Sequence, residues 1–143
     1  MKLLDSEGRL NYMNINGQCI MEIDDFILFK NKYWWDLWDE ETREIVKNAV
    51  AKARNGEKTQ FQAPGATTKG THKWWDGIVS PMQEYGGIEK LPQILAISRD
   101  ITKQKQLEIR QSELLNRFQS LVMQAPVAIC VLRGTEYLIE IIN

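Results

Sequence analysis

Three strand-like runs follow one another between residues 58 and 99, and only short polar loops separate them. The runs read KTQFQAP, THKWWDGIVSPM and LPQILAISR, and the loops GATTKG and QEYGGIEK contain glycine. In the last run, Ile94 and Ala96 lie on one face and Leu95 and Ile97 on the other. Strands joined by such short connections pair antiparallel with their neighbours. The sequence therefore predicts an antiparallel meander.

An amphipathic helix is expected before these strands, in KYWWDLWDEETREIVKNAVAKARNGE. Asp39 is a candidate N-cap, Glu40 and Glu41 lie in the first turn, and Asn55-Gly56 is a stop signal. One apolar stripe runs along this helix, formed by Ile45, Val46, Ala49, Val50 and Ala53. Such a stripe needs a flat apolar surface, and the strands that follow can supply one.

The N-terminal part predicts a hairpin and a short helical stretch. KLLDSEGRLNYMN has turn residues between two apolar runs, with Leu10 and Tyr12 on one face and Met13 on the other. Helical spacing follows, at Ile15, Cys19 and Ile23. The order is then two strands, a helical middle and three strands. This order predicts an α+β fold with a five-stranded antiparallel sheet and helices on one face.

Charge and composition exclude several classes of protein. Eighteen basic and nineteen acidic residues leave a net charge of −1, which argues against nucleic-acid binding and against a polybasic membrane patch. No apolar run approaches the roughly 20 residues of a membrane span, and MKLLDSEG does not read as a signal peptide. We expect a cytoplasmic location, although a parent protein could carry a membrane segment. The cysteines, Cys19 and Cys130, are expected to be reduced and structural.

A second helix is expected over residues 102–125, directly after the last strand. Written as heptads, it places Leu107, Leu114 and Leu121 at d positions and Phe118 at an a position. A helix with this seam needs a partner, and a second copy of the chain would make a homodimer. The alternative is that the helix folds back on its own sheet.

Residues 126–143 return to strand-like sequence and echo the start of the chain. LLDSEGRLNYMN and VLRGTEYLIEIIN share the order of apolar run, glycine-containing turn, apolar run and terminal asparagine. The spacing is that of one whole module, a connecting helix and the beginning of another. The predicted organisation is a first domain over 1–101, a connecting helix over 102–125 and the first hairpin of a truncated second domain over 126–143.

The chain resembles PAS domains, and the resemblance covers nearly its whole length. The segments that carry it are LDSEGRLNYMN, YWWDLWDEETREIVKNAVAKARNGE, FQAPGATTKGTHKWWDGIVSPM, ISRDITKQKQLE and FQSLVMQAPVAICVLRG. The resemblance implies a sensory and signal-relay module that sits beside further PAS or kinase domains, most often in a bacterial sensor histidine kinase. It implies that the final edge of the sheet feeds a signalling helix, with Asp100 and Thr102 coupling the two. Thr102 would be the N-cap, unless both residues only start a helix.

The cofactor-binding branches of this family have characteristic residues that can be looked for in the sequence. The flavin branch carries a reactive cysteine in a motif that is absent around Cys19, and the haem branch uses a histidine on the long helix, whereas His72 lies in a turn. Neither cofactor is expected, and no metal is. A small-molecule pocket and a filled core are both open for one set of residues, Trp34, Trp38, Trp74, Trp75, Ile45 and Ala49.

Adjacent tryptophans on one strand cannot both face the helices, so one ring of Trp74 and Trp75 is expected to point outward as a candidate dimer or interdomain contact.

Catalysis is not expected of this segment, because the sequence has no G-x-S-x-G, no P-loop and no glycine-rich kinase loop. Three functions remain in decreasing order: a sensory and dimerisation module, a ligand-free structural spacer, and a small enzyme.

Overall fold

The computed structural model describes residues 1–82 and 92–124, together with the backbone of residues 130–133 and 138–141. The chain divides into two compact units, Met1–Thr102 and Lys103–Asn143. The first unit contains the elements β1 (Lys2–Asp5), β2 (Leu10–Met13), α1 (Ile15–Ile20), the 3-10 helices η1 (Phe26–Leu28) and η2 (Trp34–Leu37), α2 (Glu40–Arg54), β3 (Thr59–Ala66), β4 (His72–Pro81) and β5 (Gln93–Asp100). The predicted loop QEYGGIEK lies outside the described residues.

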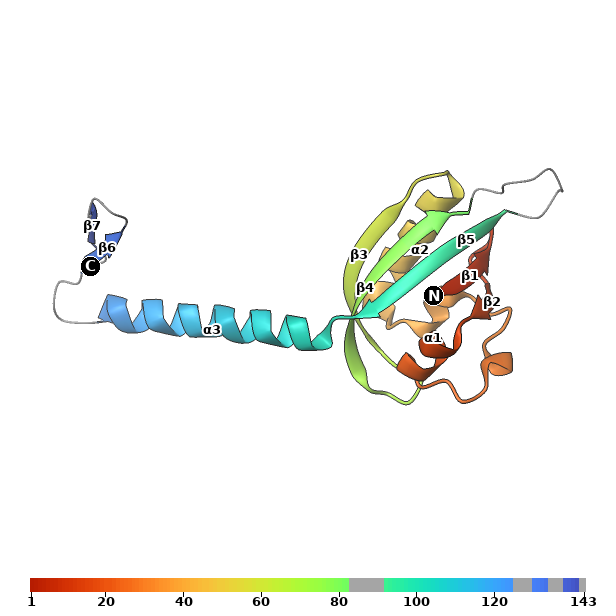
Figure 1. The fold of residues 1–143 in the computed structure, drawn as a ribbon, viewed down its shortest axis with the longest axis horizontal. Helices are drawn as coiled ribbons and strands as arrows, with labels where there is room; N and C mark the ends of the chain where they lie inside the picture. Colours follow the sequence, from red (N-terminus) through yellow and green to blue (C-terminus); the bar gives the residue numbers. More distant parts are fainter. Residues whose placement is uncertain (83–91, 125–129, 134–137, 142–143) are drawn as a thin grey trace. The chain divides into compact units, whose positions relative to one another are not determined.

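The five strands form one antiparallel sheet in the order β2-β1-β5-β4-β3 (Figure 1). The predicted meander is confirmed for β3, β4 and β5, because each pairs antiparallel with the next. The expectation that the last strand is an edge was wrong. β1 pairs with β5 on its free side, with Leu3 opposite Leu95, so the last strand lies in the centre of the sheet. Long-range pairing between the two ends of the domain, which local sequence does not encode, decides this position.

The first hairpin contains an irregularity that alters its faces. The register between β1 and β2 shifts at Leu3 and Leu4, which face Tyr12 and Leu10, so one extra residue is accommodated in β2. As a result Leu10 and Met13 are both buried, whereas Tyr12 is exposed. The expected strict alternation, with Leu10 and Tyr12 on one face, was therefore wrong.

Helix α2 lies across one face of the sheet and contacts β3, β4 and β5 (Figure 1). Its buried residues follow the predicted stripe with one change, and they are Thr42, Val46, Ala49, Val50 and Ala53. Ile45, expected in the stripe, is 42% exposed because it lies at the margin of the arc that the buried residues occupy around the helix. Asp39 takes the N-cap position but makes no side-chain capping hydrogen bond.

Helix α1 is shorter than its predicted apolar spacing. Asn14 caps it by accepting a hydrogen bond from the Gly17 N–H at 3.0 Å, and it ends at Ile20, before Ile23 is reached. Ile15 is 77% exposed, and the helix contains no buried residue. Only Ile23 of the expected helical stripe joins the core, and it does so from the loop beyond the helix.

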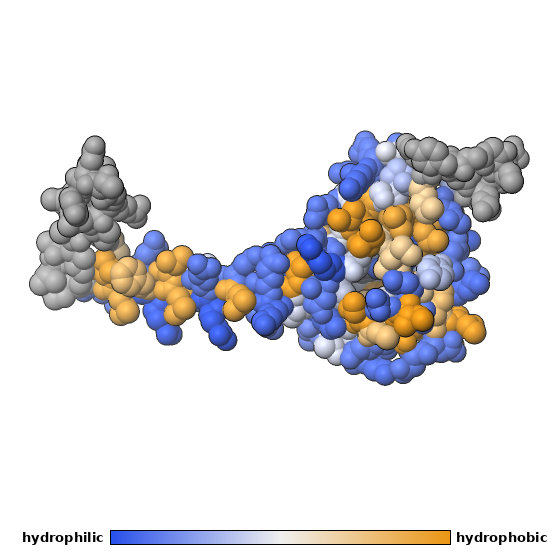
Figure 2. All heavy atoms as spheres, viewed as in Figure 1, coloured by the Kyte–Doolittle hydropathy of each residue, from blue (hydrophilic) through white to orange (hydrophobic). Residues whose placement is uncertain are grey.

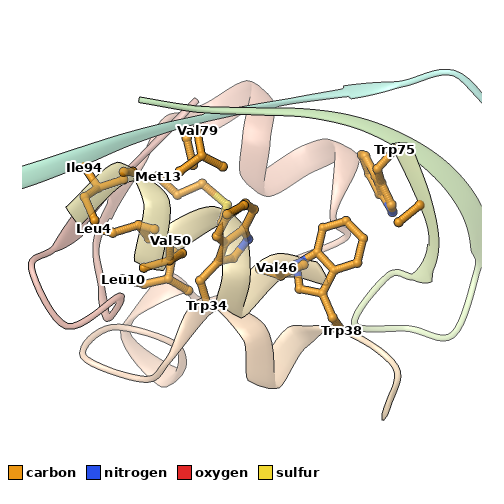
Figure 3. Close-up of a cluster of buried hydrophobic side chains, with 14 of the residues drawn as sticks. Leu4, Leu10, Met13, Trp34, Trp38, Val46, Val50, Trp75, Val79 and Ile94 are labelled. Atoms are coloured by element: carbon orange, nitrogen blue, oxygen red, sulfur yellow. The ribbon is translucent and has the colours of Figure 1, made fainter. Parts of the chain in front are cut away.

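The core lies between the sheet and α2 and is built around three tryptophans. Trp34, Trp38 and Trp75 are buried and point into the same space (Figure 3). The rings of Trp34 and Trp38 meet edge to face, with centroids 6.0 Å apart. The indole N–H of Trp75 donates to the Gly65 carbonyl oxygen at 3.0 Å. Trp74, which alternates with Trp75 along β4, is half-buried on the opposite face of the sheet.

The second unit contains α3 (Thr102–Gln124, whose first residue belongs to the first unit) and the strands β6 (Cys130–Arg133) and β7 (Leu138–Ile141). The predicted second helix is confirmed, and β6 and β7 pair antiparallel with Cys130 opposite Ile141. Within the described part of the chain, no helix combines the length and the apolar character that a membrane crossing needs.

Candidate functional site: the strand-to-helix junction and the sheet cavity

The junction between β5 and α3 is held by backbone bonds to the neighbouring strand β4. The N–H of Ile101 donates to the Trp74 carbonyl oxygen at 2.9 Å, and the Trp74 N–H donates to the Thr102 hydroxyl oxygen at 3.1 Å. Ile101 itself is 5% exposed, so its side chain joins the buried part of the domain. Residues 101 and 102 are thus fixed to the peptide groups of Trp74 on both sides.

Asp100 completes this junction. It accepts hydrogen bonds from the backbone N–H of Thr102 at 3.0 Å and from the Thr102 hydroxyl, and it pairs with the Lys73 ammonium at 3.2 Å. Burial alone would raise the pKa of Asp100, but the bonds from Thr102 and then the Lys73 ammonium hold that pKa below its ordinary value. The expected ion pair and hydrogen bonds of Asp100 are therefore present.

Thr102 differs in detail from its expected place. It is the first residue of α3, and its hydroxyl bonds Asp100 and Trp74, whereas an N-cap hydroxyl bonds the helix's own first turn. The sequence marked the correct residue, because Ser, Thr and Asp at a helix start satisfy polar backbone groups. It could not show that the partner lies on a strand more than 25 residues away.

The predicted seam of α3 is exposed in the single chain. The exposed fractions are 56% for Leu107, 59% for Leu114, 61% for Phe118 and 63% for Leu121. Figure 2 shows apolar residues at intervals along α3, between hydrophilic ones. Large apolar side chains repeated along one helix are unfavourable in water and mark a surface for a partner.

The residues proposed as pocket or core divide between three environments. Trp34, Trp38 and Trp75 surround a space of only about 10 Å³, and Ala49 is 2% exposed in the same cluster. That volume is near the lower limit for one water molecule. The interior between the tryptophans is therefore filled by the protein itself. Ile45 lies outside this cluster, and Trp74 lies on the other face of the sheet.

Lys2 is the main residue that the sequence analysis missed. It is 3% exposed, its ammonium donates to the Ser98 hydroxyl oxygen at 2.7 Å, and it lies 4.8 Å from the centroid of the Trp34 ring. Burial lowers the pKa of Lys2 to about 7. The signal was available in the alternation of β1, because residue 2 must share a face with the core residue Leu4.

A cavity of about 150 Å³ opens beside Lys2. It is lined by Met1, Lys2, Asn16, Gly17, Ile20, Met21, Trp75 and Ser98.

The cysteine and histidine considered as cofactor ligands from the sequence are not part of this lining: Cys19 and His72 are both exposed. Across residues 1–82 and 92–124, the structure brings together no group of three or more side chains of the kinds that hold a metal ion.

Comparisons with known proteins agree with this architecture. Solved structures similar to the chain include a PAS domain from Colwellia psychrerythraea, with a TM-score of 0.59 and 18% identity over 71% of this chain and 85% of that one. The N-terminal domain of a diguanylate cyclase with a PAS/PAC sensor from Marinobacter aquaeolei has a TM-score of 0.58 and 13% identity, over 73% of this chain and 95% of that one. The PAS domain of an HTR-like protein from Haloarcula marismortui has a TM-score of 0.56 and 19% identity, over 70% of this chain and 78% of that one.

A search of curated proteins finds no match. The family described as PAS fold matches residues 2–106, which is most of the chain and includes the whole sheet, α2 and the junction. The chain belongs to the PAS fold family.

Proposed function

We propose that this chain is a sensory and signal-relay module of a bacterial signal-transduction protein of the sensor histidine kinase type, working in the cytoplasm as a dimer. In this role the sheet responds to a stimulus, and α3 carries the response to the next domain. The likeness to a diguanylate cyclase sensor domain and to an HTR-like PAS domain supports a signalling context.

The observation that carries the proposal is the hydrogen-bonded junction at residues 100–102. Trp74 on β4 both accepts from Ile101 and donates to Thr102, and Asp100 bonds Thr102 and Lys73. A shift of β4 relative to β5 would therefore change the position of the first residue of α3. Because the helix is a rigid hydrogen-bonded rod, a change at its start would be passed along its length.

Dimerisation follows from the seam of α3. Leu107, Leu114 and Leu121 recur every seven residues, and each is more than half exposed in the single chain. Two parallel copies would bury these side chains against each other. A relay then has a physical output, because a movement of the helix start changes how the two helices pair.

A ligand-free spacer is the second candidate, and the filled space among the three core tryptophans favours it. This space has room for about one water, so a larger ligand could enter it only by displacing one of these tryptophans. Such a module would pass on a signal from a neighbouring domain through the same junction.

Replacing Asp100 with alanine tests the coupling role. The change removes the carboxylate that accepts both hydrogen bonds from Thr102 and that pairs with Lys73, so we expect the unfolding free energy of the domain to fall by about 1–2 kcal/mol at pH 7. We also expect amide exchange at Trp74 and Ile101 to become at least about tenfold faster, because their bonds depend on the position of Thr102. Urea titration and amide exchange followed by NMR measure the two effects.

Asp24→Ala is the matched control, since Asp24 forms an exposed ion pair with Lys69 at 2.9 Å. It should cost less than about 0.5 kcal/mol and leave exchange at the junction unchanged. Equal exchange rates at Trp74 and Ile101 in wild type and in Asp100→Ala would contradict the proposal.

A further inference from the structure

Lys2 places a cationic group inside the domain without a carboxylate beside it. Its ammonium contacts the hydroxyl of Ser98 and the face of Trp34, and within the described residues no acidic side chain forms an ion pair with it. Buried charges are normally paired, because leaving water without a counter-charge is costly. An ammonium has three N–H donors, and Ser98 takes one.

The cavity beside Lys2 has room for a ligand that would supply the missing counter-charge. Its volume of about 150 Å³ is some ten times the roughly 10–15 Å³ that a single water molecule needs. Lys2 and Ser98, which are hydrogen-bonded to each other at 2.7 Å, both belong to the lining, and Met21, Ile20 and Trp75 supply apolar surface. A ligand that fits this lining has one anionic end and a short apolar body.

We propose that this cavity binds a short-chain monocarboxylate. The carboxylate accepts hydrogen bonds from the Lys2 ammonium and the Ser98 hydroxyl, and the alkyl chain packs against Met21 and Trp75. This inference names the ligand class for the sensory role proposed above and therefore rests on it. The Lys2 ammonium can pair with one carboxylate, and the apolar lining disfavours a fully hydrated anion such as phosphate.

The surroundings of Lys2 make the binding dependent on pH. The elements that meet here contribute neutral side chains: Ser98 from β5, Trp75 from β4, Trp34 from η2, Asn16 and Ile20 from α1, and Met21 after α1. The amino group of Met1 also belongs to the cavity lining, and its pKa is lowered by burial and then by the Lys2 ammonium. A carboxylate needs the protonated form of Lys2, so affinity should fall as pH rises above about 7.

Titrating propionate and butyrate into the 143-residue chain tests the proposal, with binding followed by NMR and calorimetry. At pH 6.5 we expect saturable binding of one molecule, and at least about tenfold weaker binding of propionamide, which lacks the charge. At pH 9.0 propionate should bind at least about tenfold more weakly than at pH 6.5.

Lys2→Met keeps the length of the side chain and removes its charge, so propionate should bind at least about tenfold more weakly to it. Ser98→Ala should weaken binding to a smaller degree, and it provides a second variant if Lys2→Met folds poorly. Lys58→Met removes a charge from an exposed lysine and should leave binding unchanged. Equal affinity for propionate and propionamide, full binding by Lys2→Met, or binding of inorganic phosphate in place of propionate would overturn the proposal.

Failure here is distinguishable from failure of the proposed function. If no carboxylate binds, while the chain is a dimer and Asp100→Ala loosens the junction, the module is the ligand-free spacer and the cavity inference alone is wrong. If propionate binds but the chain is a monomer with an unaltered junction in Asp100→Ala, the relay is wrong and the cavity assignment stands.

Discussion

Replacing Leu114 and Leu121 together with lysine should convert a dimer of this chain into a monomer. Both side chains occupy d positions of α3 and are more than half exposed in the single chain, so a second copy is what would bury them. Lysine at both positions places four ammonium groups in the seam of a dimer, where each loses water without gaining a partner. We expect self-association to weaken by at least about 100-fold, or about 2.7 kcal/mol, in sedimentation equilibrium.

The matched control places the same charges on the other side of the same helix. Asn116 and Met123 are also seven residues apart, and both lie two residues after a d position, away from the seam. Lysine at these two positions should leave the association constant unchanged. A double d-position variant that remains as dimeric as wild type would show that α3 does not associate through this seam.

Stability should rise as the pH is raised from about 7 towards 10, and Lys2 is the reason. In the folded chain the pKa of Lys2 is about 7, whereas in the unfolded chain it returns to its ordinary value of 10.5. Between these values the unfolded state binds more protons, so a higher pH favours the folded state, and below about pH 7 the effect ends. From pH 6.5 to 9.5 we expect this one residue to add about 2–4 kcal/mol to the unfolding free energy.

Urea unfolding of wild type and Lys2→Met at the two pH values isolates this contribution. Other groups that titrate in this range are common to both chains, so they cancel in the difference. Lys2→Met should be the more stable chain at pH 6.5, and the gap should narrow as the pH rises. If the difference in unfolding free energy between the two chains changed by less than about 0.5 kcal/mol from pH 6.5 to 9.5, Lys2 would keep its ordinary pKa and would not be buried as a charge.

Local signals made much of this fold predictable from the sequence. α2 ends at Arg54, just before Asn55-Gly56, as expected from the stop signal, and α3 begins at the Asp-Ile-Thr segment where the strand pattern ends. The alternation in β5 holds, with Ile94 and Ala96 buried. Each of these features depends on residues within a few positions of one another, so periodicity and end signals suffice to locate them.

Features that depend on distant partners were not predictable in the same way. The central place of β5 requires β1 to pair with it across the whole domain, and the shift between β1 and β2 moves Met13 into the core. The exposure of Ile45 depends on the angle at which α2 meets the sheet. The cavity beside Lys2 forms where β1, β5 and α1 meet, and no single segment of the sequence contains it.

Disulfide cross-linking across the seam tests most directly whether the helix that leaves the sheet pairs with its copy. With Cys19 and Cys130 replaced by serine, Leu114→Cys places one thiol at a d position and Asn116→Cys places one on the outer side. Parallel helices in register bring the two copies of residue 114 to within disulfide range, roughly 4.4–6.8 Å between Cα atoms. We predict that mild oxidation links Leu114→Cys into covalent dimers at least about tenfold faster than Asn116→Cys. Equal rates at the two positions, or no cross-linking at residue 114, would contradict a relay through paired helices.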